Sequence, residues 1–175
     1  KRPDDSKSVQ SVIFVTSGKL SITIDGKNYS LVVGSYVYIP AGSIWQLINE
    51  NTETASFHWI RKRYCSVDGI TPPKAFITND ANVKPVAMPG TEERWATSRF
   101  VDPADLSHDM HVNIVTFQPG CTIPFAETHV MEHGLFILNG KAVYHLNQDW
   151  IEVEAGDFLL LRAFCPQACY AGGPK

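Results

Sequence analysis

The stretch that decides the fold runs from Val12 to Ile39 and reads VIFVTSGKLSITIDGKNYSLVVGSYVYI. It contains short runs rich in Val, Ile, Phe, Tyr and Thr, which are separated by Ser17-Gly18, Asp25-Gly26 and Gly34. Within residues 20–24, apolar and hydroxyl side chains alternate, which is the period of a strand with one buried face. Short strands with turn residues between them predict an all-β barrel or sandwich.

The same rhythm continues on both sides of this stretch and is interrupted once. Residues 61–107 are irregular in pattern and rich in Pro, Gly, Asn and Asp. The sequence therefore predicts three parts, namely a β domain at 1–60, an irregular linker at 61–107 with one short strand near 75–77, and a second β domain at 108–175. We expect strands at 12–16, 20–24, 29–33, 36–39, 45–48 and 55–60, and again at 112–118, 134–138, 142–146, 150–153, 158–161 and 167–170.

The second block of strands repeats the first at a constant offset of 122 residues. Internal similarity at a fixed offset is best explained by duplication of one β unit. The positions that recur are Phe14, Gly18, Lys19 and Gly34, which reappear as Phe136, Gly140, Lys141 and Gly156.

Composition excludes several classes of partner. Fifteen Lys and Arg against 18 Asp and Glu give a net charge of −3, which offers no basic surface for nucleic acid or an acidic membrane. No apolar run is long enough for a membrane-spanning helix, and the polar start 1–7 does not resemble a signal sequence. Four irregularly spaced cysteines predict free thiols in a reducing cytosol. We expect a cytoplasmic protein with a small-molecule partner.

Two stretches with fixed spacings resemble the cupin family. Gly34-SYVYI-Pro40-Ala-Gly42-SI-Trp45-QLI-Asn49 is similar to the second cupin motif, with Trp45 in the place of the histidine. Glu127-Thr-His129-VME-His133-GLFILN-Gly140 is similar to the first cupin motif, with the glutamate and one histidine exchanged. The resemblance implies an all-β bicupin of two tandem double-stranded β-helix (jelly-roll) barrels, which we expect to be incomplete at both chain ends.

The second repeat carries a candidate metal site. Even intervals separate Glu127, His129 and His133, so these side chains project from one face of an extended chain. The cupin resemblance adds Gln167, which corresponds to Trp45 and stands where a cupin carries its last histidine. Two imidazoles, one carboxylate and one amide oxygen suit a divalent ion, with Mn²⁺ preferred and Fe²⁺ or Zn²⁺ as alternatives.

The first repeat lacks this donor set. The same offset places Asp5, Lys7 and Ser11 where Glu127, His129 and His133 stand, and Trp45 where Gln167 stands. A lysine and a tryptophan do not build such a metal site. We therefore expect the first repeat to hold no metal and to serve as a scaffold or dimerisation module, through which the protein forms homo-oligomers.

The resemblance narrows to one group of bicupins. Arg61-Lys62-Arg63-Tyr64 at the end of a degenerate first repeat, followed by the Glu, His, His, Gln set, is similar to the ureidoglycine aminohydrolases, also known as glyoxylate-induced bicupins. This resemblance implies Mn²⁺-dependent release of ammonia from (S)-ureidoglycine, a late step of allantoin degradation. It implies catalytic roles for Glu127, which would bind metal and contact the substrate amine, and for Tyr144 as a substrate contact.

Alternatives remain open at this point. Tyr144 is equally consistent with an ordinary aromatic residue that fills the barrel. The same metal site could serve an oxygenase or an isomerase, in which open positions on Fe²⁺ bind O₂ or a diol. A bicupin that binds or stores a ligand without catalysis would have no metal at these four residues.

Overall fold

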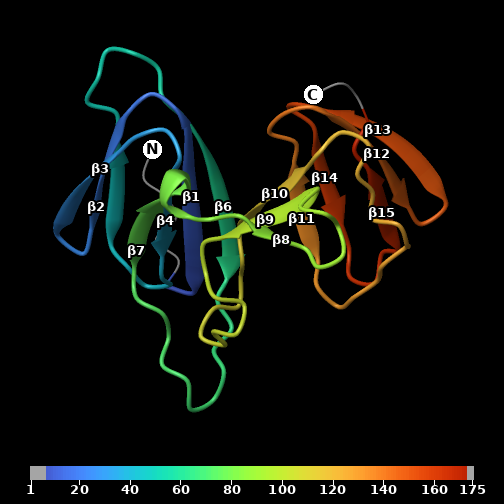
Figure 1. The fold of residues 1–175 in the computed structure, drawn as a ribbon. Helices are drawn as coiled ribbons and strands as arrows, with labels where there is room; N and C mark the ends of the chain where they lie inside the picture. The colour runs from blue at the N-terminus through green and yellow to red at the C-terminus, as the bar shows by residue number, and fades with distance from the viewer. Residues whose placement is uncertain (1–6, 173–175) are drawn as a thin grey trace. The chain divides into compact units, whose positions relative to one another are not determined.

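The computed structural model describes residues 7–172, and these residues form two compact units whose regular secondary structure is almost entirely β-strand (Figure 1). Unit 1 contains residues 7–86 and 98–114, and unit 2 contains residues 87–97 and 115–172. The prediction of an all-β chain is confirmed.

Unit 1 consists of two antiparallel sheets that enclose a core. One sheet has the strand order β6-β1-β4-β7 and the other has the order β3-β2-β5. Side chains from the inner faces of both sheets form this core, which includes Ile13 and Val37 from one sheet and Ile22 and Leu31 from the other. The strands are β1 (Val9–Ser17), β2 (Leu20–Ile24), β3 (Lys27–Leu31), β4 (Ser35–Ile39), β5 (Trp45–Ile48), β6 (Ser56–Arg63) and β7 (Phe76–Asn79).

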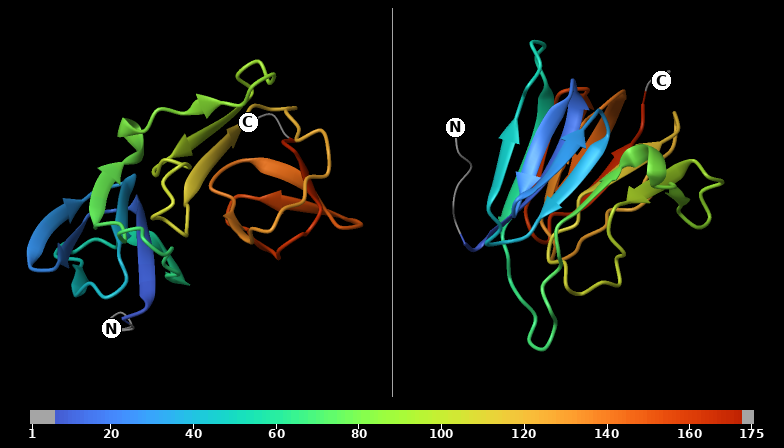
Figure 2. Two further views of the ribbon diagram at one scale, coloured as in Figure 1. Left: turned by 90° about the horizontal axis from the view of Figure 1, so that it is seen from below. Right: turned by 90° about the vertical axis from the view of Figure 1, so that its left-hand side faces the viewer.

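Unit 2 repeats this plan with five strands. Their sheets have the orders β11-β14 and β13-β12-β15, and they curve round a common interior (Figure 2). The core includes Leu135 and Leu159 from the first sheet and Val153 and Cys169 from the second. The strands are β11 (His133–Phe136), β12 (Lys141–Leu146), β13 (Asp149–Glu154), β14 (Phe158–Leu161) and β15 (Gln167–Tyr170).

The strands that recur in both units are paired in the same order and in the same register. Ile22 lies opposite Tyr29 in unit 1, and Tyr144 lies opposite Ile151 at the same offset in unit 2. The pairing of β2 with β5 likewise recurs in the pairing of β12 with β15. Because a slip of one residue would turn every side chain to the other face of the sheet, an identical register supports the duplication inferred from the sequence.

The segment 61–107 holds more regular structure than the sequence predicts. Besides β7 it contains the 3-10 helix Asp80–Asn82, β8 (Val86–Ala87) and β9 (Trp95–Arg99). Strands β8 and β9 form a three-stranded sheet with β10 (Asn113–Phe117) in the order β10-β9-β8. The sequence WATSR of β9 contains a single strongly apolar residue, so hydrophobic periodicity gave no signal for it.

Gly34 shows why a glycine recurs at this point of both repeats. Its φ angle is +81°, and a Cβ atom built there would lie 2.1 Å from Oδ1 of Asp80. Its counterpart Gly156 also has a positive φ of +100°. Glycine adopts this left-handed conformation without the steric penalty of other residues, and at Gly34 it also leaves room for the Asp80 side chain.

The outer face of the β1–β4 pair is buried, whereas its counterpart in unit 2 is exposed. Tyr36 and Tyr38 are fully buried beneath Phe76, Phe100 and neighbouring apolar side chains of unit 1. The equivalent outer face of unit 2 exposes 41% of Phe136, 65% of Phe158 and 68% of Leu160. The shared fold therefore carries different surfaces in its two copies.

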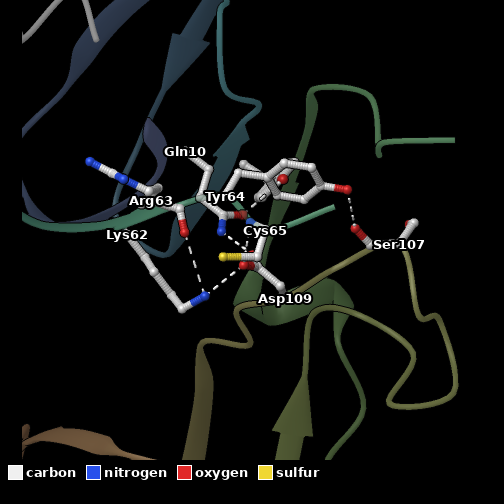
Figure 3. A network of polar contacts seen from close by, with 8 residues as sticks. Gln10, Lys62, Arg63, Tyr64, Cys65, Ser107 and Asp109 are labelled. Atoms are coloured by element: carbon white, nitrogen blue, oxygen red, sulfur yellow. Dashed lines mark hydrogen bonds and ion pairs between the residues drawn. The ribbon is translucent and has the colours of Figure 1, made fainter. Parts of the chain in front are cut away.

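A polar network around Asp109 holds the segment 105–112 on unit 1 (Figure 3). The Asp109 carboxylate forms an ion pair of 2.6 Å with Lys62 and accepts a hydrogen bond of 2.8 Å from the backbone N–H of Cys65. It also accepts a hydrogen bond from the fully buried amide of Gln10, whose oxygen accepts a bond of 3.0 Å from the Tyr38 hydroxyl. One carboxylate thus ties this segment to β1 and β6.

These contacts change the acidity of Asp109. Burial on its own would raise the pKa of the carboxyl, but hydrogen bonds from Lys62, Cys65 and Gln10 lower the pKa on balance. The ionised form is therefore the form that stabilises the fold.

Two findings bear on the expected surroundings of the protein. All four cysteines are free thiols. Among residues 7–172 there is no helix with the length and apolar character that crossing a membrane would require.

The Asp109 network predicts a pH-dependent stability. In Asp109→Asn, we expect the free energy of unfolding at pH 7 to fall by about 1–3 kcal/mol, because an ion pair and charge-assisted hydrogen bonds are lost. Since the folded pKa is lowered, the parent should lose this stability as the pH falls below the ordinary value of about 4 towards the folded pKa. Urea unfolding at stepped pH measures both effects, with the exposed Asp68→Asn as control. Equal pH slopes in parent and Asp109→Asn would contradict this role.

Candidate metal centre

The candidate metal ligands of unit 2 lie on two neighbouring extended segments. The segment around Glu127 runs antiparallel to β15, and Glu127 and Gln167 exchange two backbone hydrogen bonds of 2.9 Å. A further bond of 2.7 Å runs from the N–H of Phe164 to the carbonyl of His129, and His133 begins β11. Backbone pairing thus fixes the positions of all four predicted residues.

Three of the four predicted side chains meet. Nε2 of His133 lies 2.9 Å from Nε2 of His129, and Nε2 of Gln167 lies 3.1 Å from the same nitrogen of His129. The two imidazole rings are nearly perpendicular, with an interplanar angle of 72°. Gln167 is only 7% exposed, so this cluster is anchored at the buried end of the site.

The spacing of these atoms fits a metal ion. Two neighbouring ligands of an octahedral ion, each bound at about 2.1 Å, lie about 3 Å apart. The distances between the donors of His129, His133 and Gln167 are close to this value. A half-turn of the Gln167 amide would present its oxygen in place of its nitrogen, which is the donor that a divalent cation requires.

The surroundings of His133 favour the neutral form of its imidazole, which is the form that binds metal ions. Burial, followed by the neighbouring His129, lowers the pKa of His133, while Glu127 opposes this effect. A lowered pKa keeps the His133 ring neutral near pH 7, and neutral imidazole is the ligand form. The Nδ1 atom of His129 lies 3.2 Å from the carbonyl oxygen of Met131, which is the kind of contact that orients a ligand histidine.

Glu127 is the predicted ligand that stands apart. Among residues 7–172, no group of three or more His, Cys, Asp or Glu side chains is arranged to hold a metal ion. Glu127 is half-buried and is close enough to influence the acidity of His133 and Tyr144. Its role as a ligand stays a prediction.

Tyr144 lies in the core beside this cluster. It is 9% exposed and packs with Ile123, Leu159 and Cys169. Burial, followed by the electrostatic influence of Cys169, raises the pKa of the hydroxyl above its ordinary value. Tyr144 is therefore a neutral hydrogen-bonding group at any physiological pH, and its contact with substrate stays a prediction.

Cys169 is the neighbour of the site that the sequence analysis did not single out. It lies opposite Tyr144 in the pairing of β12 with β15, two residues after Gln167. A signal was available, because the same offset of 122 residues maps this pair onto Ile22 and Leu47 of unit 1, which also lie opposite one another. Cys169 was not predicted as a neighbour of the site, because a single cysteine in a strand does not by itself indicate a functional role.

The equivalent positions of unit 1 carry different chemistry. Ser11 accepts a hydrogen bond of 3.1 Å from the indole N–H of Trp59, and Trp45 packs edge-to-face on Trp59 with ring centroids 5.8 Å apart. Lys7 is exposed, and Asp5 lies outside the described residues. Aromatic packing thus occupies the place that the donor cluster takes in unit 2.

Comparison with known proteins gives related sequences in bacteria and plants. The chain is 31% identical to the (S)-ureidoglycine aminohydrolase of Escherichia coli over 95% of its own length and 63% of that protein. It is 28% identical to the (S)-ureidoglycine aminohydrolase of Arabidopsis thaliana over 92% of its length and 52% of that protein. The chain therefore spans between half and two thirds of the length of these curated relatives.

Solved structures share the fold. A protein of Pseudomonas aeruginosa provisionally described as glyoxylate-induced is 57% identical, with a TM-score of 0.91 over 98% of this chain and 64% of its own. A salicylate 1,2-dioxygenase of Pseudaminobacter salicylatoxidans is only 13% identical at a TM-score of 0.69, so it shares the fold alone. The cupin domain family matches residues 3–61 and 113–174, which together are more than half of the chain. With its duplicated strand order and these two matching segments, the chain belongs to the cupin domain family.

Proposed function

We propose that the protein acts as a metal-dependent aminohydrolase that releases ammonia from (S)-ureidoglycine and leaves ureidoglycolate. The observation that carries this proposal is the meeting of the His129, His133 and Gln167 side chains beside the backbone of Glu127. The similarity to aminohydrolases of E. coli and A. thaliana supports the choice of substrate.

Four residues would hold the metal ion, namely Glu127, His129, His133 and Gln167. We propose Mn²⁺, because a donor set with one carboxylate and one neutral amide oxygen suits a harder ion than a thiolate site does, with Fe²⁺ and Zn²⁺ as alternatives. When bound, such an ion would supply a Lewis acid that binds the substrate carboxylate and lowers the pKa of a bound water.

The protein's own residues would act on the amine. In the overall reaction the C–N bond to the amine breaks, a C–O bond to water forms, and one hydrogen of that water ends on the ammonia. The lone pair of the ureido nitrogen helps to expel the amine. Glu127 would contact the substrate amine and pass to it the proton given up by water, so that the amine leaves as ammonia, and Tyr144 would hold an N–H group of the substrate.

This proposal is tested by metal analysis and an ammonia assay on the purified protein. We expect Mn²⁺-dependent ammonia release from ureidoglycine and none from allantoin, because allantoin carries no free amine on the corresponding carbon. Omitting Mn²⁺ is the control, and the spontaneous decay of ureidoglycine is the baseline. Oxygen uptake would favour an oxygenase instead, and release no faster than the baseline would reject the aminohydrolase.

Gln167 and Trp45 occupy equivalent places in the two units and form a matched pair of variants. We expect Gln167→Ala to weaken metal binding by roughly tenfold, because a ligand is removed while the fold persists. Trp45→Ala should instead lower the free energy of unfolding by about 3 kcal/mol, since it empties a partly buried aromatic position. Isothermal titration of Mn²⁺ and urea unfolding separate the two effects. Metal loss in folded Trp45→Ala with full retention in Gln167→Ala would place the ion in unit 1.

We also propose that the protein works in the cytoplasm as a homo-oligomer. Four free thiols are consistent with a reducing compartment. The exposed apolar outer face of unit 2, formed by Phe136, Phe158 and Leu160, adds to the reasons to expect association. Light scattering at tens of micromolar (~50 μM) measures the state, and a monomer at that concentration would argue against association.

A further inference from the structure

Phe164 lies in a tight turn that occurs once in each unit. The turn spans residues 162–165 in unit 2 and residues 40–43 in unit 1, and the two are related by the offset of 122 residues. In both, the N–H of the fourth residue donates a hydrogen bond to the carbonyl of the first, at 3.1 Å in unit 2 and 3.3 Å in unit 1. Phe164 therefore occupies the place that Gly42 takes in unit 1.

The third residue of this turn has a left-handed backbone in both units. The φ angle is +85° at Gly42 and +62° at Phe164. Glycine adopts this conformation without steric cost, whereas the Cβ atom of another residue is crowded against a neighbouring carbonyl oxygen. In the described part of the chain, the other non-glycine residues with a positive φ are all polar, namely Asp25, Glu92, Glu93 and Asn147. Phe164 is thus a bulky apolar residue in a strained conformation.

Packing does not account for the phenylalanine. Phe164 is 65% exposed, so its ring gains little from burial to offset the strain of the backbone. Unit 1 builds the same turn with glycine. A residue that is both strained and exposed does not serve the stability of the free protein, and residues of this kind cluster at functional sites.

The turn lies against the candidate metal centre. The N–H of Phe164 donates a hydrogen bond of 2.7 Å to the carbonyl of His129, and Gln167 follows three residues later. In unit 1, a Cβ atom built at Gly42 would lie 3.8 Å from the carbonyl oxygen of Lys7, which corresponds to His129. The side chain of Phe164 therefore begins beside the backbone of one proposed metal ligand, on the segment that leads to another.

We propose that Phe164 is a substrate-contact residue, whose ring packs on the planar ureido group and so selects ureido acids. The inference rests on the proposed function, in which the substrate carboxylate lies at the metal ion and the ureido group is left for other contacts. A flat, neutral group stacks on an aromatic face with little loss of hydration. The turn holds the backbone of Phe164 in place before the ligand arrives, which lowers the entropy cost of binding.

The test uses the Mn²⁺-loaded protein and N-carbamoylglycine, a stable ureido acid that lacks the reactive amine. We expect Phe164→Gly and Phe164→Leu to weaken its binding by roughly two- to tenfold, the range of one aromatic contact. Phe164→Tyr should bind like the parent because it keeps the ring. Calorimetric titration measures all four proteins.

A matched control and a kinetic measurement accompany the titration. Leu106 is 67% exposed and belongs to unit 1, so Leu106→Ala removes a similarly exposed apolar side chain away from the candidate metal centre and should bind like the parent. In the ammonia assay, Phe164→Gly should raise KM for ureidoglycine by the same factor as it weakens binding and leave kcat unchanged, because the contact forms with the substrate itself.

The two turns also allow the strain to be measured by exchange. Phe164→Gly should leave the midpoint of thermal unfolding within about 2 °C of the parent and leave Mn²⁺ binding unchanged, because unit 1 already has glycine at this place. Gly42→Phe should lower the midpoint by about 2–4 °C, since it introduces the strain where no ligand is contacted.

Each outcome supports or overturns the contact. Equal affinity and equal KM in parent and Phe164→Gly overturn it even if the parent releases ammonia, and so does a loss of Mn²⁺ binding or a fall of more than about 5 °C in the midpoint of Phe164→Gly, which would assign the ring to the fold. Full affinity in Phe164→Leu overturns the preference for a planar group. A parent that neither binds N-carbamoylglycine nor releases ammonia rejects the proposed function and the contact with it.

Discussion

The antiparallel pairing of β12 with β15 is the constraint on which the candidate site depends. In this register Leu146 lies opposite Gln167 and Tyr144 lies opposite Cys169. A slip by one residue would turn Gln167 out of the barrel and bring Ala168 in, because the side-chain period of a strand is two. The segment of Glu127 then follows the other side of β15, so one strand determines where both oxygen donors stand.

The two units show how a fixed backbone plan can carry different chemistry. The pairing of β2 with β5 in unit 1 has the register of β12 with β15, yet Trp45 replaces the amide and Ser11 replaces an imidazole. Tryptophan contributes apolar area and an edge-to-face contact with Trp59, and both stabilise the barrel. The donor cluster of unit 2 instead brings polar atoms together in a partly buried place, which costs stability unless they are paired or bind a ligand.

Much of the fold followed from the sequence, because strand period and turn residues are local signals. All twelve strands expected in the two β blocks overlap observed strands. Eleven of them belong to the two repeats, and the twelfth, expected at 112–118, overlaps β10. The strand β9 was missed because its residues show no alternation. The Asp109 network was missed for another reason, since Gln10, Lys62 and Asp109 are far apart in sequence and only the folded chain brings them together. Gln167 was found because the repeat supplied a long-range signal, and Cys169 was missed because that signal was not followed to its neighbour.

The division of the chain between its units has a consequence for folding and for dissection. The chain leaves unit 1 after Val86, gives residues 87–97 to unit 2, returns for 98–114 and departs again at Val115. Neither unit is one continuous segment, so no single cut between them yields two complete pieces. A fragment that ends near residue 107, where the sequence suggested a boundary, would lose Asp109 and keep a segment that belongs to the other unit. Limited proteolysis in this region should therefore remove residues from both units at once, since each unit draws on two stretches of the chain.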